Sequence, residues 1–395
     1  MKIISVNAGS SSLKFKLFDM IDESVIASGL FERIGIDGSF YTIKAHGEKI
    51  KEEIELPTQE VAVKILLNKL IALNIISSLD EIDGVGHRVV SGAYKYKDST
   101  FITDEVINNI DEIKNLAPLH NPDDVLVMRA FKEILPDTPM VAVFDTTFHQ
   151  TIEKINYLYP VPYDWYENYH VRKYGAHGTS YRYVTAKMQE ILGKENVNLI
   201  VCHLGSGGSV CAIKDSKSID TSMGFTPLAG IMMGTRSGDI DPSIIPYVME
   251  KEGKNAMEVI DDLNHHSGLL GMSEVSSDSR DIEQGIIDGN DKCVLTQEKY
   301  CKTVVSYIAQ YYVLLDGKID ALVFTAGIGE NSVNTRLNIV NKLSCLGIKI
   351  DEEKNNVRGE IRKINTDDSK SSVYVIPTDE ELVIAKDTLS FVNNR

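Results

Sequence analysis

Hydrophobic and polar positions follow the same pattern in two stretches of the chain, one at its start and one near its middle. Residues 3–18 form an apolar run, a turn of small polar residues at Gly9–Ser12, and a second run in which apolar and polar residues alternate. Residues 199–213 repeat this pattern around Gly205–Gly208. Apolar runs of strand length joined by Gly and Ser predict β-hairpins. Two such hairpins in one chain favour a duplicated fold.

Elsewhere along the chain, the spacing of apolar residues alternates between that of strands and that of helices. Apolar residues at helical spacing predict helices at 59–73, 103–115, 122–135, after 178, at 242–250, 256–263, 294–315, after 331 and at 380–391. Short apolar runs predict strands at 25–30, 40–43, 84–90, 140–145, 320–325 and 373–376. The aromatic segment 157–174 is expected to link two halves. Strands followed by alternating helices and strands predict an α/β fold.

Composition narrows the class of protein. A chain of 395 residues is long enough for two domains, and its net charge of -16 argues against general binding of nucleic acid or anionic membranes. The five cysteines are scattered without a C-x-x-C, so neither a disulfide framework nor a zinc site is indicated. The start lacks the apolar core of a signal peptide, and no apolar run is long enough to cross a bilayer. We therefore expect a cytoplasmic protein.

The first hairpin turn has the composition of a phosphate-binding loop. Gly9 can adopt a positive φ, the hydroxyls of Ser10–Ser12 add donors to the backbone N–H groups, and Lys14 adds a charge. Such donors can converge on phosphate oxygens. The spacing of a Walker-type loop is absent, and an ordinary serine-rich turn is the alternative.

Cationic side chains stand beside glycine and serine turns. Arg88 ends a predicted buried strand, Arg236 lies between glycines and acidic residues, Arg280 follows a run of serines, and His177 precedes Gly178. Arginine holds carboxylate and phosphoryl oxygens with two parallel hydrogen bonds. A surface ion pair at a turn is the alternative for any single arginine. Several of them beside two phosphate-type hairpins favour binding of an anion.

Two kinds of carboxylate are candidates for a metal site. Asp145 ends an apolar strand, where a charge is costly unless it is paired or holds a metal. Glu380 and Glu381 open the last helix, where an acidic residue also stabilises the helix N-terminus. Asp145 with one of these glutamates could bind Mg²⁺.

A glycine turn at 325–331 joins a predicted strand to the next helix. Such a turn allows a flat ring to lie against the backbone, which suits a nucleotide base. A plain strand–helix connection explains the same residues, so this motif leaves both interpretations open.

Six ordered motifs together resemble the acetate kinase family, within the superfamily of acetate and sugar kinases, Hsp70 and actin. They are found at Val6–Lys14, Leu116–Pro122, Phe144–Gln150, Met223–Leu228, Met232–Pro242 and Phe324–Asn331. The resemblance covers essentially the whole chain. It implies two duplicated ribonuclease H-like or actin-like domains of βββαβαβα topology, with the active site in the cleft between them. The implied domains are 1–148, completed by 379–395, and 149–378.

The resemblance also implies an activity and its partners. It implies a phosphotransferase with a carboxyl group as acceptor, which reversibly transfers the ATP γ-phosphoryl group to acetate by direct in-line displacement. Mg²⁺ or Mn²⁺ is the implied metal, ATP the co-substrate, and a homodimer the implied assembly. A carboxylate is already ionised at neutral pH, so catalysis reduces to positioning and charge stabilisation.

By motif position, the resemblance assigns roles to individual residues. The first phosphate loop includes Asn7, Ser10, Ser12 and Lys14, and the second includes His203, Leu204, Gly205, Ser206 and Gly207. The nucleotide site takes Asp278, Ser279, Arg280, Ala326, Gly327, Ile328, Gly329 and Asn331. Arg88, Asp145, His177 and Arg236 are the implied catalytic residues, with His120 as a further neighbour of the phosphoryl group. Asn7, Asp145 and Glu380 serve the metal, while Arg88, Val90, Leu119, Ala176 and Pro227 form the substrate site.

Four positions depart from the family pattern. Ala176 replaces a common Phe, Ser206 replaces an Asn, Ser91–Ala93 replaces His-Gly-Gly, and Tyr181 replaces a His. The shorter Ser206 puts one contact of the second phosphate loop in doubt. If Ala176 lines the acyl pocket, the missing ring leaves room for a longer chain, at about 0.8 kcal/mol for each buried methylene. We then expect propionate or butyrate to be accepted as well as acetate or better, unless neighbouring side chains fill the space and acetate stays preferred.

Two other functions remain as alternatives. A propionate or butyrate kinase of the same fold differs only in its pocket contacts. A nucleotide-driven conformational protein of the Hsp70 or actin type needs no small acceptor, but it would not need Arg88, His120, His177 and Arg236 in these motifs.

Overall fold

The computed structural model describes residues 1–117 and 120–394, and the chain divides into two compact units. The first unit comprises Met1–Thr147 together with Asp379–Arg395, and the second comprises Phe148–Thr378. The domain boundaries expected from the sequence lie one residue from this division. Leu119, an expected substrate contact, lies outside the described residues.

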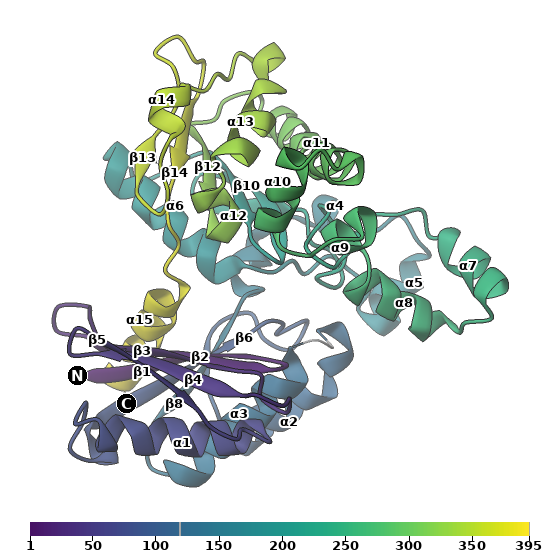
Figure 1. Cartoon of the computed structure of the whole chain (residues 1–395). Helices are drawn as coiled ribbons and strands as arrows, with labels where there is room; N and C mark the ends of the chain where they lie inside the picture. Colours follow the sequence, from purple (N-terminus) through teal and green to yellow (C-terminus); the bar gives the residue numbers. More distant parts are fainter. Residues whose placement is uncertain (118–119, 395) are drawn as a thin grey trace. The chain divides into compact units, whose positions relative to one another are not determined.

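The first unit is built on an eight-stranded sheet of order β5-β4-β3-β2-β1-β6-β8-β7 (Figure 1). Its strands are β1 (Lys2–Gly9), β2 (Ser12–Asp19), β3 (Ser24–Glu32), β4 (Phe40–Ala45), β5 (Glu48–Glu53), β6 (Ile82–Val89), β7 (Thr100–Phe101) and β8 (Met140–Phe144). The strands β1 to β5 form an antiparallel meander, and β6 and β8 run parallel to β1. The parallel strands end at the same edge of the sheet, where Arg88 and Asp145 are found.

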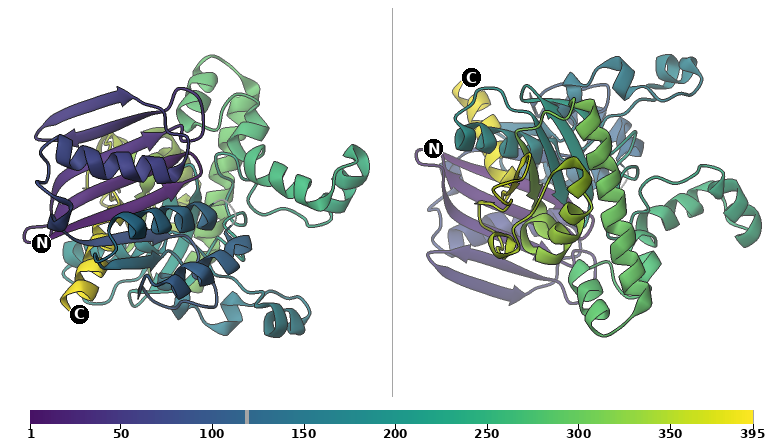
Figure 2. Two further views of the ribbon diagram at one scale, coloured as in Figure 1. Left: turned by 90° about the horizontal axis from the view of Figure 1, so that it is seen from below. Right: turned by 90° about the horizontal axis from the view of Figure 1, so that it is seen from above.

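Helices cover both faces of this sheet. They are α1 (Gln59–Ala72), α2 (Asp104–Glu112), α3 (Asn121–Ile134) and α15 (Glu380–Asn393), with short 3-10 helices at Leu79–Glu81 and Lys114–Leu116. The helices α1 and α3 pack on the face that carries the main core of the unit (Figure 2). The helix α15 packs on the opposite face, against β1, β6 and β8.

A glycine on β6 explains how the C-terminal helix returns to the first unit. A Cβ atom at Gly86 would lie 2.3 Å from Thr388 Oγ1 and 2.5 Å from Ile384 Cγ2, both on α15. Only a residue without a side chain allows the helix to approach the strand this closely. This packing places Glu380, at the start of α15, in the first unit.

The second unit contains a six-stranded sheet of order β11-β10-β9-β12-β14-β13. Its strands are β9 (Leu199–Leu204), β10 (Gly208–Lys214), β11 (Lys217–Thr221), β12 (Ala321–Thr325), β13 (Arg362–Lys363) and β14 (Ser372–Val375). The hairpin of β9 and β10 is antiparallel, whereas β12 and β14 run parallel to β9. The hairpin and the two following parallel strands reproduce the arrangement of β1, β2, β6 and β8, which is the duplication that the sequence predicted.

The second unit is rich in helices. They are α4 (Lys154–Tyr157), α5 (Tyr163–Tyr169), α6 (Gly178–Leu192), α7 (Ile244–Glu252), α8 (Ala256–His265), α9 (Gly268–Ser273), α10 (Ser279–Ile287), α11 (Asp291–Leu314), α12 (Ala326–Asn331), α13 (Val333–Asn341) and α14 (Glu352–Asn355), with 3-10 turns at Thr147–Thr151 and Ser344–Leu346. None of the helices in the described ranges is long and apolar enough to cross a membrane.

Two local expectations were wrong. Gly9 is not among the described residues with positive φ, and its role is close approach, because a Cβ there would lie 2.8 Å from Ser12 Oγ. Within the glycine turn expected at 325–331, residues Ala326–Asn331 form the short helix α12. Its start is stabilised by Glu330, whose carboxylate accepts a hydrogen bond of 2.8 Å from the Ala326 N–H.

The strands β5 and β11 were not predicted, because charged residues hide their apolar pattern.

Candidate functional site

Arg88 is the centre of a polar cluster in the first unit. Its Nη2 lies 2.5 Å from Asp145 Oδ2, its Nε donates to Asp145 Oδ1 at 3.2 Å, and its Nη1 donates to Asn7 Oδ1 at 3.2 Å. Glu380 Oε2 is 3.7 Å from the Arg88 Nε. These residues come from β1, β6, the end of β8 and the start of α15. The fold thus brings the three expected metal ligands around one expected substrate-binding arginine.

Burial and charge act against each other in this cluster. Asp145 is fully buried, and the Arg88 side chain is only 15% exposed. Burial alone lowers the pKa of Arg88, but the charges of Asp145 and Glu380 outweigh it and raise that pKa. Burial raises the pKa of Glu380 to about 7, against the attraction of Arg88. A second cation beside Asp145 and Glu380 would relieve this cost.

The donor set of this cluster fits Mg²⁺. Asn7 offers an amide oxygen, and Asp145 and Glu380 offer carboxylates, which are the hard oxygen ligands that Mg²⁺ prefers. Within residues 1–117 and 120–394, no group of three or more His, Cys, Asp or Glu side chains could by itself hold a metal. A site with two carboxylates and one amide must therefore take its remaining ligands from water or substrate oxygens.

The three acidic residues at the start of α15, Asp379, Glu380 and Glu381, have different partners. Asp379 caps the helix, accepting a hydrogen bond of 3.2 Å from the Leu382 N–H. Glu381 pairs with Lys14 and, at 3.3 Å, with Lys16. Burial tends to raise the pKa of Glu381, but these lysines lower it to about 2. Glu380 lies in the first turn of α15, where a negative charge is favoured, and it also faces Arg88.

The first hairpin turn presents part of its expected phosphate site. Ser10 is exposed and Ser12 is half-buried. Gln59, at the start of α1, donates from Nε2 to the Gly9 carbonyl at 2.7 Å and so holds the turn in place. The exposed Lys14 is paired with Glu381. The Lys14 ammonium has three N–H donors, so it can keep this partner and still donate to a phosphate oxygen.

The segment after Arg88 is held by α3. The side chain of Asn121 accepts from the Ser91 N–H at 3.3 Å and donates to the Ser91 carbonyl at 3.0 Å. Val90 is buried, and His120 is the N-cap residue of α3. Asp124 on α3 is buried, which raises the pKa of its carboxyl well above the usual range. Neither Asn121 nor Asp124 was expected from the sequence.

In the second unit, two histidines form the centre of a buried polar group. The rings of His177 and His203 are stacked, with centroids 4.0 Å apart. His177 Nδ1 lies 2.8 Å from Ser209 Oγ, and His203 Nδ1 lies 2.8 Å from Ser180 Oγ. His177 has a left-handed backbone, with φ of 60°, at the N-cap of α6. A non-glycine residue in this conformation is strained, and such strain often marks functional sites.

Arg236 and His177 lie on the same side of the second hairpin turn. A Cβ atom at Gly207 would be 3.4 Å from Arg236 Nη1 and 3.8 Å from His177 Nε2. Arg236 Nη1 donates to the Pro227 carbonyl at 3.3 Å. The fold therefore gathers three expected residues, Arg236, His177 and Pro227, beside a backbone turn.

Ala176 is placed in the core of the second unit. It is 2% exposed and belongs to the same apolar cluster as Leu204, Val210 and Met233. Its carbonyl oxygen lies 2.9 Å from His149 Nε2, which fixes the peptide next to His177. In this unit the Ala176 methyl group is packed by neighbours.

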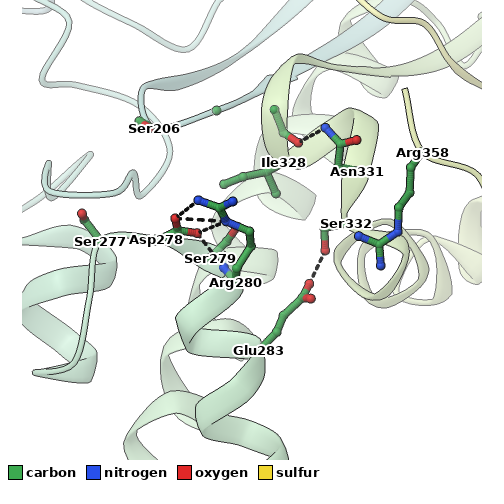
Figure 3. A pocket seen from close by; sticks show the side chains of 12 residues that line it. Ser206, Ser277, Asp278, Ser279, Arg280, Glu283, Ile328, Asn331, Ser332 and Arg358 are labelled. Carbon is green, nitrogen blue, oxygen red and sulfur yellow. Dashed lines mark hydrogen bonds and ion pairs between the residues drawn. The ribbon is translucent and has the colours of Figure 1, made fainter. Parts of the chain in front are cut away.

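A cavity of about 520 Å³ joins the second hairpin turn to α10 and α12 (Figure 3). Its lining residues are Gly205, Ser206, Ser277, Asp278, Ser279, Arg280, Glu283, Gly327, Ile328, Asn331, Ser332 and Arg358. Eight of these were expected to bind nucleotide; Ala326, Gly329, His203, Leu204 and Gly207 were expected but do not line the cavity. Glu283, one turn after Arg280 on α10, could have been found from helical spacing, whereas nothing in the sequence pointed to Arg358.

The polar side chains of this cavity are oriented by local hydrogen bonds (Figure 3). The Arg280 Nε donates to Asp278 Oδ1 at 2.9 Å, and the Asn331 amide donates to the Gly327 carbonyl at 2.9 Å. Arg280 is 87% exposed, so its guanidinium is accessible at the mouth of the cavity. Ser332 hydrogen-bonds Glu283 on the opposite wall.

Comparison with known proteins gives one consistent result. The sequence profile of the acetokinase family matches residues 2–386. The chain is 53% identical to an acetate kinase of Aster yellows witches'-broom phytoplasma over 395 residues, covering 100% of this chain and 96% of the relative. It is also 53% identical to an acetate kinase of Bacillus subtilis, with 98% of each chain covered.

Solved structures agree with the sequence comparison. An acetate kinase of Porphyromonas gingivalis matches with a TM-score of 0.91 and 42% identity, covering 99% of both chains. A propionate kinase of Francisella tularensis matches with a TM-score of 0.94 and 40% identity, covering 98% of this chain and 99% of that one. These matches confirm the predicted two-domain actin-like fold.

Proposed function

Because the chain belongs to the acetokinase family, we propose that it catalyses the reversible transfer of the ATP γ-phosphoryl group to acetate, giving acetyl phosphate and ADP. The observation that carries the proposal is the full-length similarity to acetate kinases at 53% identity. The polar cluster of Arg88 and the pair of Arg236 and His177 supply the chemistry that this reaction needs.

The reaction requires charge stabilisation and no general base. One oxygen of the acetate carboxylate attacks the γ-phosphorus, and the bond from that phosphorus to the β,γ-bridging oxygen breaks. The electron pair of the broken bond leaves with ADP. Charge spreads over the equatorial oxygens of the transferring group, where fixed cations and N–H donors stabilise it.

Each cationic or imidazole group has a task in this scheme. Arg88 binds the acetate carboxylate with its forked guanidinium, held in position by Asp145 and Asn7. Arg236 stabilises the transferring phosphoryl group, as arginines do in other phosphoryl transfers. His177 donates a hydrogen bond to the same group.

The residues Asn7, Asp145 and Glu380 would hold Mg²⁺. When bound, Mg²⁺ neutralises phosphate oxygens. The pKa of about 7 that burial gives Glu380 leaves this ligand partly protonated near neutrality, so metal binding is expected to release a proton.

The cavity at α10 and α12 is proposed to bind adenosine. Its walls combine backbone at Gly327 and the side chain of Ile328 with the polar groups of Asp278 and Arg280. Flat apolar surface and a few polar groups suit a purine nucleoside. Ser206, at the phosphate end, lines the same cavity despite its short side chain.

Acetate is the proposed acceptor, with longer carboxylates as the second candidate. Ala176 sits among core side chains, which favours a filled pocket and therefore acetate. The similarity to a propionate kinase at 40% identity keeps propionate as the alternative. Acyl phosphate formation from ATP, trapped with hydroxylamine, should show the highest kcat/KM for acetate among acetate, propionate and butyrate. A higher value for propionate or butyrate would assign the chain to the longer acids.

Replacing Arg236 by alanine tests the catalytic assignment. Arg236→Ala is expected to lower kcat by about 10³-fold or more, the effect typical of an arginine that stabilises a transferring phosphoryl group. The circular dichroism spectrum should stay unchanged, because Arg236 is only half-buried. Arg362→Ala, which removes an exposed arginine paired with Glu360, is the control. Near-normal turnover in a folded Arg236→Ala enzyme would refute the role.

We propose that the protein is a homodimer and that it is located in the cytoplasm. No side chain of α7 is buried, and α8 buries only Val259. Tyr247 on α7, Met257 on α8 and Trp165 on α5 are exposed, although such large apolar residues favour burial. A second copy of the chain is the proposed cover. Light scattering should give twice the mass of the chain, and Tyr247→Glu should reduce it.

A nucleotide-driven conformational protein is the competing class. It would bind ATP without forming an acyl phosphate from any of the three acids. That result, together with measured ATP binding, would reject the kinase proposal.

A further inference from the structure

Arg236 lies in the loop of residues 230–239, whose two ends are joined by hydrogen bonds between Gly230 and Asp239. The Asp239 N–H donates to the Gly230 carbonyl at 2.9 Å, and Asp239 Oδ1 accepts from the Gly230 N–H at 2.8 Å. Gly230 is buried, where an N–H group needs a partner in the protein. One carboxylate therefore completes the closure of the loop that carries Arg236.

The helix α11 anchors this loop at two points. Tyr307 donates its hydroxyl to Asp239 Oδ2, the carboxylate oxygen that Gly230 does not use. Thr303, one turn earlier on α11, accepts from the Met232 N–H at 3.2 Å. A carboxylate has no proton to donate, so the phenol is the donor of the first of these bonds. Burial and this hydrogen bond raise the pKa of Tyr307 above its ordinary value, so the donor keeps its proton.

Arg236 stands between the two anchor points, four residues after Met232 and three before Asp239. Its carbonyl accepts from the Met233 N–H at 3.1 Å, which makes the segment between the anchors a tight turn. A catalytic group displaced by about 1 Å can lose about 10²-fold in rate. We propose that Asp239 and Tyr307 are positioning residues, which hold Arg236 where its guanidinium acts on the transferring phosphoryl group. This role rests on the proposed kinase function.

The tip of the loop is held by backbone bonds that do not involve these two side chains. The Gly234 N–H donates to the Ser206 carbonyl at 2.9 Å, and the Ser267 N–H donates to the Thr235 carbonyl at 2.9 Å. Asp239 itself is exposed. Changing it should therefore leave the fold intact and remove only the fixed spacing between α11 and Arg236.

Kinetics of single variants give the first readout. Tyr307→Phe should lower kcat about threefold to tenfold, the effect of one hydrogen bond. Asp239→Ala also removes the acceptor of the Gly230 N–H and should lower kcat about tenfold to hundredfold. Asp239→Asn keeps an oxygen for Gly230 and should recover most of that loss. Parent-like kcat in both Tyr307→Phe and Asp239→Ala would overturn the proposal.

Tyr312→Phe is the matched control for the tyrosine variant. Tyr312 lies on the same helix as Tyr307, and its buried hydroxyl has no partner among the described residues. Its replacement should leave kcat unchanged.

A double-mutant cycle separates positioning from a general structural effect. If Asp239 acts through Arg236, adding Asp239→Ala to Arg236→Ala should change kcat by less than about twofold. A merely structural role would lower kcat by the same factor in both backgrounds, and that result would overturn the proposal. Tyr307→Phe provides the same cycle if Asp239→Ala does not fold.

Hydrogen exchange of the full chain, followed by mass spectrometry, measures the loop independently of activity. The amides of residues 230–239 should exchange faster in Tyr307→Phe than in the parent or in Tyr312→Phe. Exchange at the parent's rate would overturn the proposal. Faster exchange in a protein whose parent forms no acyl phosphate would leave the anchoring of Arg236 standing and reject the kinase function. An active parent whose cycle shows equal losses would reject the positioning role and keep the kinase function.

Discussion

At the scale of single residues, Arg88 supplies the positive charge on which the first unit's polar cluster depends. It is the cation that compensates the fully buried carboxylate of Asp145 and the half-buried carboxylate of Glu380. Breaking a buried ion pair leaves an uncompensated charge in a low dielectric and costs about 3–5 kcal/mol. The same arginine is proposed to bind acetate, so stability and function depend on one side chain.

Arg88→Gln should therefore destabilise the protein as well as abolish activity. We expect the free energy of unfolding in urea to fall by about 3–5 kcal/mol at neutral pH. Arg280→Gln is the matched control, because Arg280 pairs with Asp278 on the surface and should leave the unfolding curve unchanged. Equal stability of Arg88→Gln and the parent would contradict the account of this cluster.

His87, the residue before Arg88, predicts a dependence of stability on pH. Burial lowers its pKa to about 3, and its Nε2 has no partner among the described residues. The unfolded chain binds a proton at this ring below about pH 6.5, whereas the folded protein does not. The contribution of His87 to the free energy of unfolding is therefore complete above pH 6.5 and is lost as the pH falls below that value. At pH 5 the loss from this ring is about 2 kcal/mol.

Unfolding in urea at pH 7 and pH 5 measures this effect. His87→Leu should reduce the difference between the two free energies by about 2 kcal/mol. His46→Asn, which replaces an exposed histidine, is the control. The same pH difference in His87→Leu and the parent would rule out His87 as its source.

At the scale of elements, one buried arginine joins the parts of the cavity that is proposed to bind adenosine. Arg336 on α13 donates to the Gly329 carbonyl at 2.9 Å, to Asn355 Oδ1 and its carbonyl at 2.8 Å, and to the Val357 carbonyl at 2.8 Å. Burial lowers the pKa of Arg336 to about 10. Its hydrogen bonds tie α12 to the segment that carries Arg358.

Arg336→Met should loosen both walls of the cavity. Several buried carbonyls would lose their donor, so the free energy of unfolding should fall by about 3 kcal/mol or more, and ATP should bind more weakly. Arg358→Met, at an exposed position of the same cavity, should leave stability unchanged. Calorimetric titration with ATP and urea unfolding measure the two effects. Parent-like values in Arg336→Met would show that these carbonyls do not need the guanidinium.

At the scale of the whole molecule, the duplicated fold was predicted well because it depends on repeated patterns. The hairpins of β1–β2 and β9–β10 carry strong apolar patterns, and the family motifs lie in both units, between residues 6 and 331. The assignment to the acetokinase family is confirmed. The individual site roles stay predictions.

What the sequence did not reveal depends on contacts between distant residues. The grouping of Asp145 and Glu380 around Arg88 joins residues more than two hundred positions apart. The support of Ser91 by Asn121 and the buried bonds of Arg336 also have no local pattern. The helix α12 within the glycine turn expected at 325–331 was missed because glycine disfavours helices, and the hydrogen bond that the Ala326 N–H donates to Glu330 compensates.

The central claim is that an acetate oxygen attacks the γ-phosphorus of ATP. Phosphorus-31 NMR of the reaction of ATP with ¹⁸O-labelled acetate tests it most directly. The account predicts ADP together with acetyl phosphate whose phosphorus signal is shifted by ¹⁸O in the bridge to the acetyl group. Release of AMP and pyrophosphate, or acetyl phosphate without ¹⁸O in that bridge, would contradict it.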